Sequence, residues 1–161
     1  MGVFEALRGM IAPQRTEFFD ALHAGEQGDC PMCGRYAQMY RRRLHAGAAI
    51  GILKAYQKGG ASRFIHTSEL IDKGMTGAGD FSKAKYWNLI EAKAETEADK
   101  RTSGYWRLTP AGVEFAQNGR TIQEWAHVFD DRVYGFSGAE IDIEAALGVN
   151  FSYSELIGKG W

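Results

Sequence analysis

The sequence has few of the features that define several common classes of protein. It contains only two cysteines and three prolines, and one pair of cysteines cannot build the disulfide framework of a small secreted domain. No apolar run reaches the roughly 18 residues that a transmembrane helix requires. The first residues are not typical of a secretory signal, which begins with basic residues before an apolar stretch. We therefore expect a cytoplasmic protein without a membrane partner.

Composition indicates a globular domain with little overall charge. Hydrophobic residues make up 45% and aromatic residues 12% of the chain, which is enough for a packed core. The formal net charge of −1 provides little nonspecific attraction to nucleic acid. The charge is uneven, because residues 1–120 carry 17 Lys and Arg against 13 Asp and Glu, whereas residues 121–161 carry 2 against 7. A mildly basic body with an acidic tail leaves DNA binding open.

The chain divides into three predicted segments. Residues 1–37 hold a helix and a Cys-x-x-Cys knuckle, residues 38–119 form the body, and residues 120–161 form an acidic extension that packs on the body. In the first segment Thr16 is placed to cap a short helix, and the glycines predict a loop over 25–29. The apolar residues of that helix are Phe18, Phe19 and Leu22.

The body begins with a long predicted helix. Apolar residues recur every four positions from Tyr40 to Tyr56, a spacing typical of an amphipathic helix, and Gly59-Gly60 ends it. The basic triplet Arg41-Arg42-Arg43 belongs to this helix. Because successive residues are about 100° apart, the three side chains fan around it, either as a solvated flank or as contacts to phosphate or a partner.

Short elements complete the body in the order of a winged helix-turn-helix. Asn88 stands where a helix often leaves through a left-handed residue, and Thr109-Pro110 provides a cap followed by a first-turn proline. In the winged-helix order, residues 81–87 take the recognition-helix position and residues 89–108 form the wing. The predicted fold class is therefore α+β. The elements are an extended segment over 63–66, helices over 69–73 and 81–87, strands over 90–96 and 105–108, and a helix over 110–118.

The acidic extension is predicted to form a small hairpin and a helix. Strands over 125–129 and 132–136 flank a turn at Asp130-Asp131. Asp142 is placed to cap a helix over 143–147 that Gly148 ends. The residues expected to pack back on the body are Phe151, Tyr153, Leu156 and Ile157.

Five motifs together resemble a family of small, uncharacterised proteins of tailed bacteriophages. The resemblance covers about residues 30–157 and implies a winged helix that binds DNA, a zinc-knuckle-like start, and a phage or prophage protein in the cytoplasm of a host cell. Asn88 stands where the family pattern has glycine, a change that a left-handed helix exit tolerates. The motifs are Cys30-Pro-Met-Cys-Gly34, Met39-Tyr-Arg-Arg-Arg-Leu44, Lys85-Tyr-Trp-Asn-Leu-Ile90, Gly104-Tyr-Trp-Arg-Leu-Thr-Pro-Ala-Gly112 and Ala146-Leu-Gly-Val-Asn-Phe-Ser-Tyr-Ser-Glu-Leu156.

The cysteine spacing predicts half of a metal site. Cys30 and Cys33 have the spacing of a zinc knuckle, but one knuckle supplies only two of the four ligands of structural zinc. The missing ligands come from a histidine of the same chain, or a symmetric homodimer joins two knuckles into a four-cysteine site. The same spacing also fits a turn that has lost its metal, and it fits a redox pair. The histidine candidates are His23 first, then His45, His66 and His127.

The predicted recognition helix offers contacts to double-stranded DNA. If Phe81, Ala84 and Trp87 face the core, the outward residues are Ser82, Lys83, Lys85 and Tyr86. Hydroxyl and ammonium groups suit phosphates, but this helix has no Arg, Asn or Gln for bidentate contacts to base edges. In the wing, Lys100 and Arg101 are candidate backbone contacts, opposed by Glu95, Glu97 and Asp99.

Two functions therefore remain open. The first is a DNA-binding accessory or regulatory protein of a phage. The second is a protein-interaction module that inhibits or redirects a host factor, for example a host defence system, through the acidic tail and wing. We do not expect an enzyme, because Gly74-x-x-Gly77-x-Gly79 lacks the strand and lysine of a phosphate-binding loop, and the chain has neither a nucleophile elbow nor a His-Glu-x-x-His motif.

Overall fold

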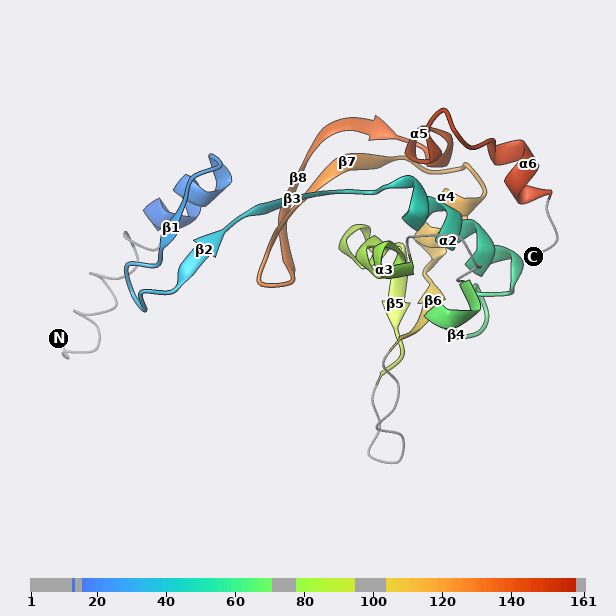
Figure 1. Ribbon diagram of the computed structural model, residues 1–161, viewed down its shortest axis with the longest axis horizontal. Coiled ribbons are helices and arrows are strands. Elements are labelled where there is room, and N and C mark those ends of the chain that lie inside the picture. The colour runs from blue at the N-terminus through green and yellow to red at the C-terminus, as the bar shows by residue number, and fades with distance from the viewer. Residues whose placement is uncertain (1–12, 14–15, 71–77, 95–103, 159–161) are drawn as a thin grey trace. The chain divides into compact units, whose positions relative to one another are not determined.

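The computed structural model describes residues 13, 16–70, 78–94 and 104–158. These residues form an α+β fold of short helices and small antiparallel sheets, as predicted (Figure 1). The chain divides into two compact units. We call Met1–Arg42 with Ala126–Gly135 the N-terminal unit, and Arg43–Trp125 with Phe136–Trp161 the main unit. The predicted segment 120–161 is thus shared between the two units.

The N-terminal unit contains a helix over residues 16–23 and a small hairpin. Strand β1 (Gln27–Asp29) pairs antiparallel with strand β2 (Tyr36–Gln38), and Gln27 lies opposite Gln38. The prediction of a loop over 25–29 is therefore wrong for 27–29, because Gly25, at a φ of +90°, turns the chain back so that these residues can pair. The core of this unit consists of Leu22, Ala37 and Met39 with Phe18, Phe19 and Phe129.

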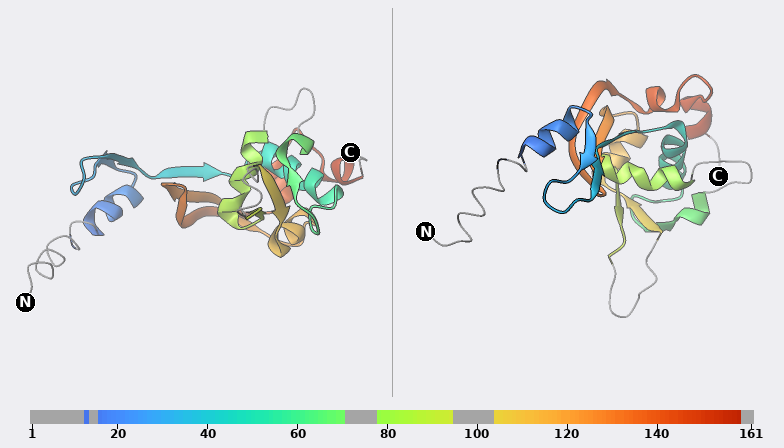
Figure 2. Two further views of the ribbon diagram at one scale, coloured as in Figure 1. Left: turned by 90° about the horizontal axis from the view of Figure 1, so that it is seen from below. Right: turned by 60° about the vertical axis from the view of Figure 1, so that its left-hand side comes forward.

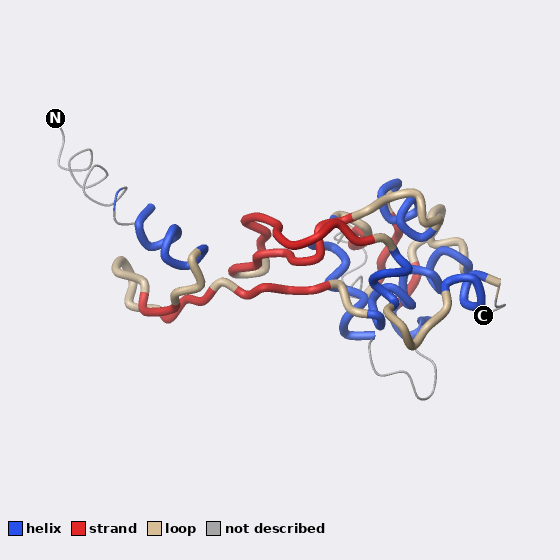
Figure 3. The backbone as a smooth tube through the Cα atoms, turned by 90° about the horizontal axis from the view of Figure 1, so that it is seen from above, coloured by secondary structure: helices blue, strands red, loops and turns tan. Residues whose placement is uncertain are grey.

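A second sheet has the strand order β3-β7-β8, drawn among the red strands of Figure 3. Its strands are β3 (Tyr40–Arg43), β7 (Ile122–Phe129) and β8 (Arg132–Ile141). The predicted hairpin is confirmed and is longer than expected. Asp130 and Asp131 both have positive φ, at 48° and 60°, as the tight turns that match the twist of a hairpin require.

The prediction of a helix from Tyr40 is wrong for its first residues. Helix α2 spans Ala46–Gln57, and the basic triplet lies on strand β3 instead. His45 is extended, with φ −82° and ψ 163°, and Arg43 forms an ion pair with Glu124 of β7 at 2.8 Å. The apolar residues recur every four positions through both the strand and the helix that follows it, but pairing in the sheet determines the structure of the first of these residues.

The other helices of the main unit pack around α2 (Figure 2). They are α3 (Ala78–Phe81), α4 (Pro110–Ala116), α5 (Ile143–Leu147) and α6 (Tyr153–Ile157). Ile52 and Leu53 of α2 are fully buried. Gly51 allows the close approach of Phe81, whose ring carbon Cδ2 would lie only 2.8 Å from a β-carbon at this position.

A third sheet lies in the main unit with the strand order β4-β6-β5. β4 (Ile65–His66) and β5 (Ile90–Ala92) both pair antiparallel with the central strand β6 (Tyr105–Leu108). The strand predicted over 105–108 is confirmed. The segments predicted over 63–66 and 90–96 form shorter strands, and residues 95 and 96 lie outside the described residues. Of the helix predicted over 69–73, residues 69 and 70 belong to a short 3-10 helix, η1 (Thr67–Leu70), and the rest lies within residues 71–77, outside the described part of the chain.

The helix predicted over 81–87 is present as the last residue of α3 followed by a 3-10 helix, η2 (Ser82–Trp87). The junction between η2 and α4 is closely packed. Asn88 has the predicted left-handed conformation, with φ 56°. Thr109 caps α4 as predicted: its hydroxyl accepts from the amide of Gly112 at 3.0 Å and donates to the carbonyl of Asn88 at 2.5 Å. A β-carbon at Gly112 would lie 1.9 Å from the carbonyl oxygen of Leu89, so only glycine fits there.

The C-terminal helices are held by polar contacts to the main unit. Asp142 caps α5 as predicted, with its carboxylate accepting from the amide of Ala145 at 2.8 Å. The hydroxyl of Tyr153 donates to the carbonyl of Ala116 at 2.8 Å, and Leu156 is buried. The prediction that Phe151 also packs back is wrong, since 45% of this residue is exposed.

Gly112→Ala should strongly destabilise the main unit. The added β-carbon must push the carbonyl of Leu89 away, which we expect to lower the free energy of unfolding by about 2 kcal/mol or more. Gly119→Ala is the matched control, because its nearest neighbour would lie at 3.4 Å and its φ is not positive, and we expect a change within about 0.5 kcal/mol. Urea denaturation of both variants measures this, and equal stabilities would contradict the packing.

Candidate functional site

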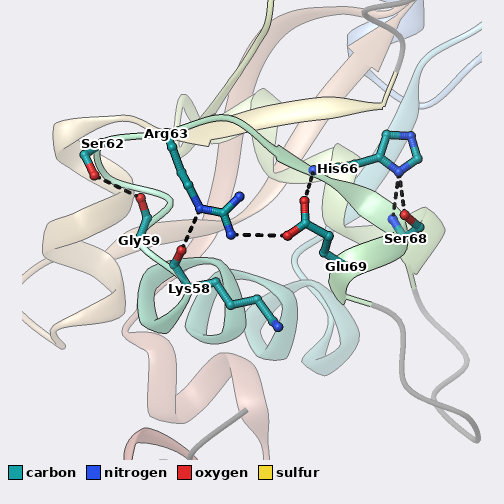
Figure 4. Close-up of polar contacts among 7 residues, drawn as sticks. All are labelled: Lys58, Gly59, Ser62, Arg63, His66, Ser68 and Glu69. Atoms are coloured by element: carbon teal, nitrogen blue, oxygen red, sulfur yellow. Dashed lines mark hydrogen bonds and ion pairs between the residues drawn. The ribbon is translucent and has the colours of Figure 1, made fainter.

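A polar network fixes the chain between α2 and η1 (Figure 4). The guanidinium of Arg63 donates to the carbonyl of Lys58 at 3.0 Å and to the carboxylate of Glu69 at 3.2 Å. The other carboxylate oxygen of Glu69 accepts from the amide of His66 at 3.2 Å, and the ring of His66 contacts the hydroxyl of Ser68 at 2.6 Å. The hydrogen bond from Arg63 lowers the pKa of Glu69. This network holds β4 at the edge of its sheet.

Helix η2 presents one apolar and one polar face. Phe81, Ala84 and Trp87 are buried, as predicted, and the indole of Trp87 donates to the carbonyl of Gln123 at 2.7 Å. The polar face is half-buried and consists of the four predicted residues, Ser82, Lys83, Lys85 and Tyr86. The structure therefore brings these four candidate side chains together on one surface, which we call the η2 face.

Intramolecular contacts already engage the two lysines of the η2 face. The ammonium of Lys83 lies 2.6 Å from the carboxylate of Asp80, one helical turn away. The ammonium of Lys85 lies 5.3 Å from the centre of the Tyr86 ring, within the range of a cation–π contact. An incoming phosphate therefore has to compete with Asp80 for the ammonium of Lys83.

Strands β5 and β6 carry two basic residues that the sequence analysis did not select. Lys93 follows β5 and lies 5.5 Å from the ring centre of Tyr105. Arg107 donates to the carboxylate of Glu91 at 2.8 Å and lies over the ring of Phe64. The pairing of Arg107 with Glu91 depends on the register of the hairpin, which sets these two residues opposite each other and which the sequence does not show. Lys100 and Arg101, with their acidic neighbours Glu95, Glu97 and Asp99, lie outside the described residues.

In the N-terminal unit, a tight turn between β1 and β2 carries both cysteines. The amide of Cys30 donates to the carbonyl of Arg35 at 2.7 Å, and the amide of Gly34 donates to the carbonyl of Cys30 at 2.8 Å. Gly34 has a φ of +69°, which closes the turn. Backbone hydrogen bonds from Met32 and Cys33 lower the pKa of the Cys30 thiol. A lowered pKa favours the thiolate, the form that binds metal.

The structure does not bring the predicted histidine ligand to the cysteines. The ring of His23 packs beside His127 and Tyr134, with centroids at 6.1 and 6.4 Å. Within the described ranges, no group of three or more His, Cys, Asp or Glu side chains is arranged to hold a metal ion. Cys30 and Cys33 therefore form a two-thiol site.

A groove of about 600 Å³ lies beside the two thiols in the N-terminal unit. Three of its large side chains are exposed: Met32 by 50%, Tyr36 by 59% and Tyr40 by 47%. Such a cluster of exposed apolar side chains on a small unit is typical of an interaction surface. The groove is lined by Phe18, Phe19, Cys30, Pro31, Met32, Cys33, Arg35, Tyr36, Ala37, Gln38, Tyr40, Phe129 and Asp130.

Comparison with protein-family models, with curated proteins and with solved structures gives no match to this chain. A functional assignment must therefore come from the geometry and chemistry of the surfaces described above. No helix in the described part of the chain is both long and apolar enough to cross a membrane.

His127 should make the N-terminal unit sensitive to acid. Burial, with the nearby charges of Arg41 and His23, lowers its pKa below the ordinary value of 6.5. The unfolded chain then binds the proton more readily, so the stability contributed by neutral His127 is present above pH 6.5 and is lost as the pH falls through the lower pKa of the folded state.

Thermal unfolding of the protein between about pH 7.5 and about pH 5.5 tests this. We expect the melting temperature to fall toward acid, and His127→Gln to flatten part of that dependence. His45→Gln is the control, because His45 is exposed at the start of α2 and should leave the dependence unchanged. An equal slope in wild type and His127→Gln would contradict a half-buried, neutral histidine at this position.

Proposed function

We propose that the main unit is a winged-helix module that binds duplex DNA, with η2 in the major groove and the β5–β6 hairpin as the wing. The order of elements supports this: α2, β4, the three short helices η1, α3 and η2, and then a hairpin whose second strand lies between β4 and β5. A winged helix has this strand order, with its recognition helix directly before the hairpin. The proposal implies a protein of the cytoplasm, that of a host cell if a phage encodes it.

The η2 face is the observation that carries the proposal. It combines two ammonium groups with the hydroxyls of Ser82 and Tyr86, and all four groups bind phosphate oxygens well. It offers no side chain for a bidentate contact to a base edge. We therefore infer binding that depends mainly on the phosphate backbone, with strong salt dependence and weak preference for sequence.

Replacing both Lys83 and Lys85 by alanine should weaken the binding of duplex DNA. Each lost phosphate contact reduces the slope of log affinity against log salt by about 0.9, so we expect the double variant to reduce it by about 1.8. Fluorescence anisotropy with labelled duplexes at several salt concentrations measures both effects.

Lys58→Ala is the single-charge control for this experiment, since Lys58 follows α2 and lies outside η2. We expect it to retain the wild-type slope. If the wild-type protein binds no duplex in a salt-dependent manner, or if Lys58→Ala loses as much affinity per charge as the double variant, the DNA-binding proposal is wrong.

A second candidate is a module that binds a host protein through its C-terminal helices. The segment between α5 and α6 favours it, because Val149 is fully exposed and Phe151 is 45% exposed. Exposed Glu144 and Glu155 flank this apolar pair in the sequence. Apolar side chains with acidic neighbours suit a protein partner better than the phosphates of DNA.

Replacing Val149 and Phe151 by serine separates the two candidates. If a host protein binds here, the double variant should lose the protein that the immobilised wild type retains from a host-cell lysate, whereas the Lys83 and Lys85 variant should keep it. If DNA is the partner, the Lys83 and Lys85 variant should lose DNA binding in the anisotropy assay, whereas the Val149 and Phe151 variant should retain it. Retention of the same protein by both variants would contradict the second candidate.

A further inference from the structure

The cysteine turn has the construction of one half of a tetrahedral metal site. Cys30 and Cys33 project from a single turn that Gly34 closes in a left-handed conformation. The amide of Cys30 donates to the carbonyl of Arg35 at 2.7 Å, and the amide of Gly34 donates to the carbonyl of Cys30 at 2.8 Å, so the backbone holds the two cysteines on one tight turn.

The chain cannot complete a four-thiolate site by itself. It has no cysteine besides Cys30 and Cys33, and structural zinc takes four ligands, mostly cysteine and histidine. His23 packs against His127 and Tyr134 instead, and among the described residues no third ligand converges on the two thiols. Cys33 is exposed, so its sulfur is accessible to another molecule.

We propose that two copies of this chain share one Zn²⁺ ion, held by Cys30 and Cys33 of each copy. Four thiols release their protons to solvent and form four zinc–sulfur bonds, with no change of oxidation state. The site is symmetric because the same turn contributes two ligands from each side, as a two-fold homodimer requires. This inference is independent of DNA binding, which concerns the main unit.

The groove beside the thiols supplies the rest of the interface. Met32, Tyr36 and Tyr40 are about half exposed in one copy, and all three line the groove together with the two cysteines. A two-fold axis through the zinc brings this surface against its own copy, so that apolar side chains of one chain cover those of the other. Tyrosine and methionine are enriched in such interfaces.

The test measures zinc content and mass on the full-length protein, purified with a thiol reductant and zinc. We expect one zinc per two chains, in a species of twice 17.9 kDa in native mass spectrometry. A chelator should give monomers, and zinc chloride alone should restore the dimer. Replacing zinc by Co²⁺ should produce the absorption bands of tetrahedral thiolate coordination.

Four variants distinguish this site from other arrangements. Cys30→Ala and Cys33→Ala should each lose both the zinc and the dimer, and circular dichroism checks that the main unit stays folded. His23→Ala should retain both, because His23 is not a ligand. Met32→Ser keeps all four ligands and should retain the zinc with a weaker dimer.

Three results would overturn the proposal. One zinc per chain in a monomer, particularly if His23→Ala releases it, would place the missing ligands in the same chain. A dimer that persists with a chelator would be held by contacts other than zinc. Reduced protein that binds no zinc at any ratio of zinc to protein would show that the cysteine turn is not a metal site. Loss of DNA binding with an intact zinc dimer would affect only the function proposed for the main unit.

Discussion

The contact between Gly112 and the carbonyl oxygen of Leu89 constrains most of the main unit. Helix α4 can begin only where its first turn touches the chain leaving η2, and a β-carbon would prevent that approach. Thr109 reinforces the contact from both sides, because its hydroxyl bonds to Asn88 and Gly112 and its amide bonds to Leu89. Since β5 begins at Ile90 and β6 ends at Leu108, the same contact fixes the register of the hairpin.

This constraint also determines which side chains of η2 reach solvent. With Asn88 left-handed and Trp87 bonded to the carbonyl of Gln123, the rotation of the helix is set and its polar residues must face outward. Their charges are partly satisfied within the chain, most clearly by the pairing of Lys83 with Asp80. A ligand that binds Lys83 must replace its contact with Asp80. The net binding free energy is therefore only the difference between the two contacts, which favours weak, salt-sensitive binding.

The sequence predicted the features that depend on neighbouring residues, and it failed where distant segments meet. Thr109 with Pro110, Asn88, and Asp142 each mark a helix end through local chemistry, and all three were located correctly. By contrast, Tyr40–Arg43 follows a helical spacing but forms a strand, because its partner β7 lies about 80 residues away in the sequence. The cysteine pair was evident from its spacing, but the position of His23 relative to it depends on packing that no local pattern reveals.

Two backbone hydrogen bonds extend the pairing at the ends of strands β5 and β6. The amide of Lys93 donates to the carbonyl of Tyr105, and the amide of Thr67 donates to the carbonyl of Gly104. The first bond continues the register of β5 on β6 by one residue, and the second ties the start of β6 to the residue that follows β4. The register is therefore set by the described strands themselves, so that a peptide tag inserted after Ala94 should leave it unchanged.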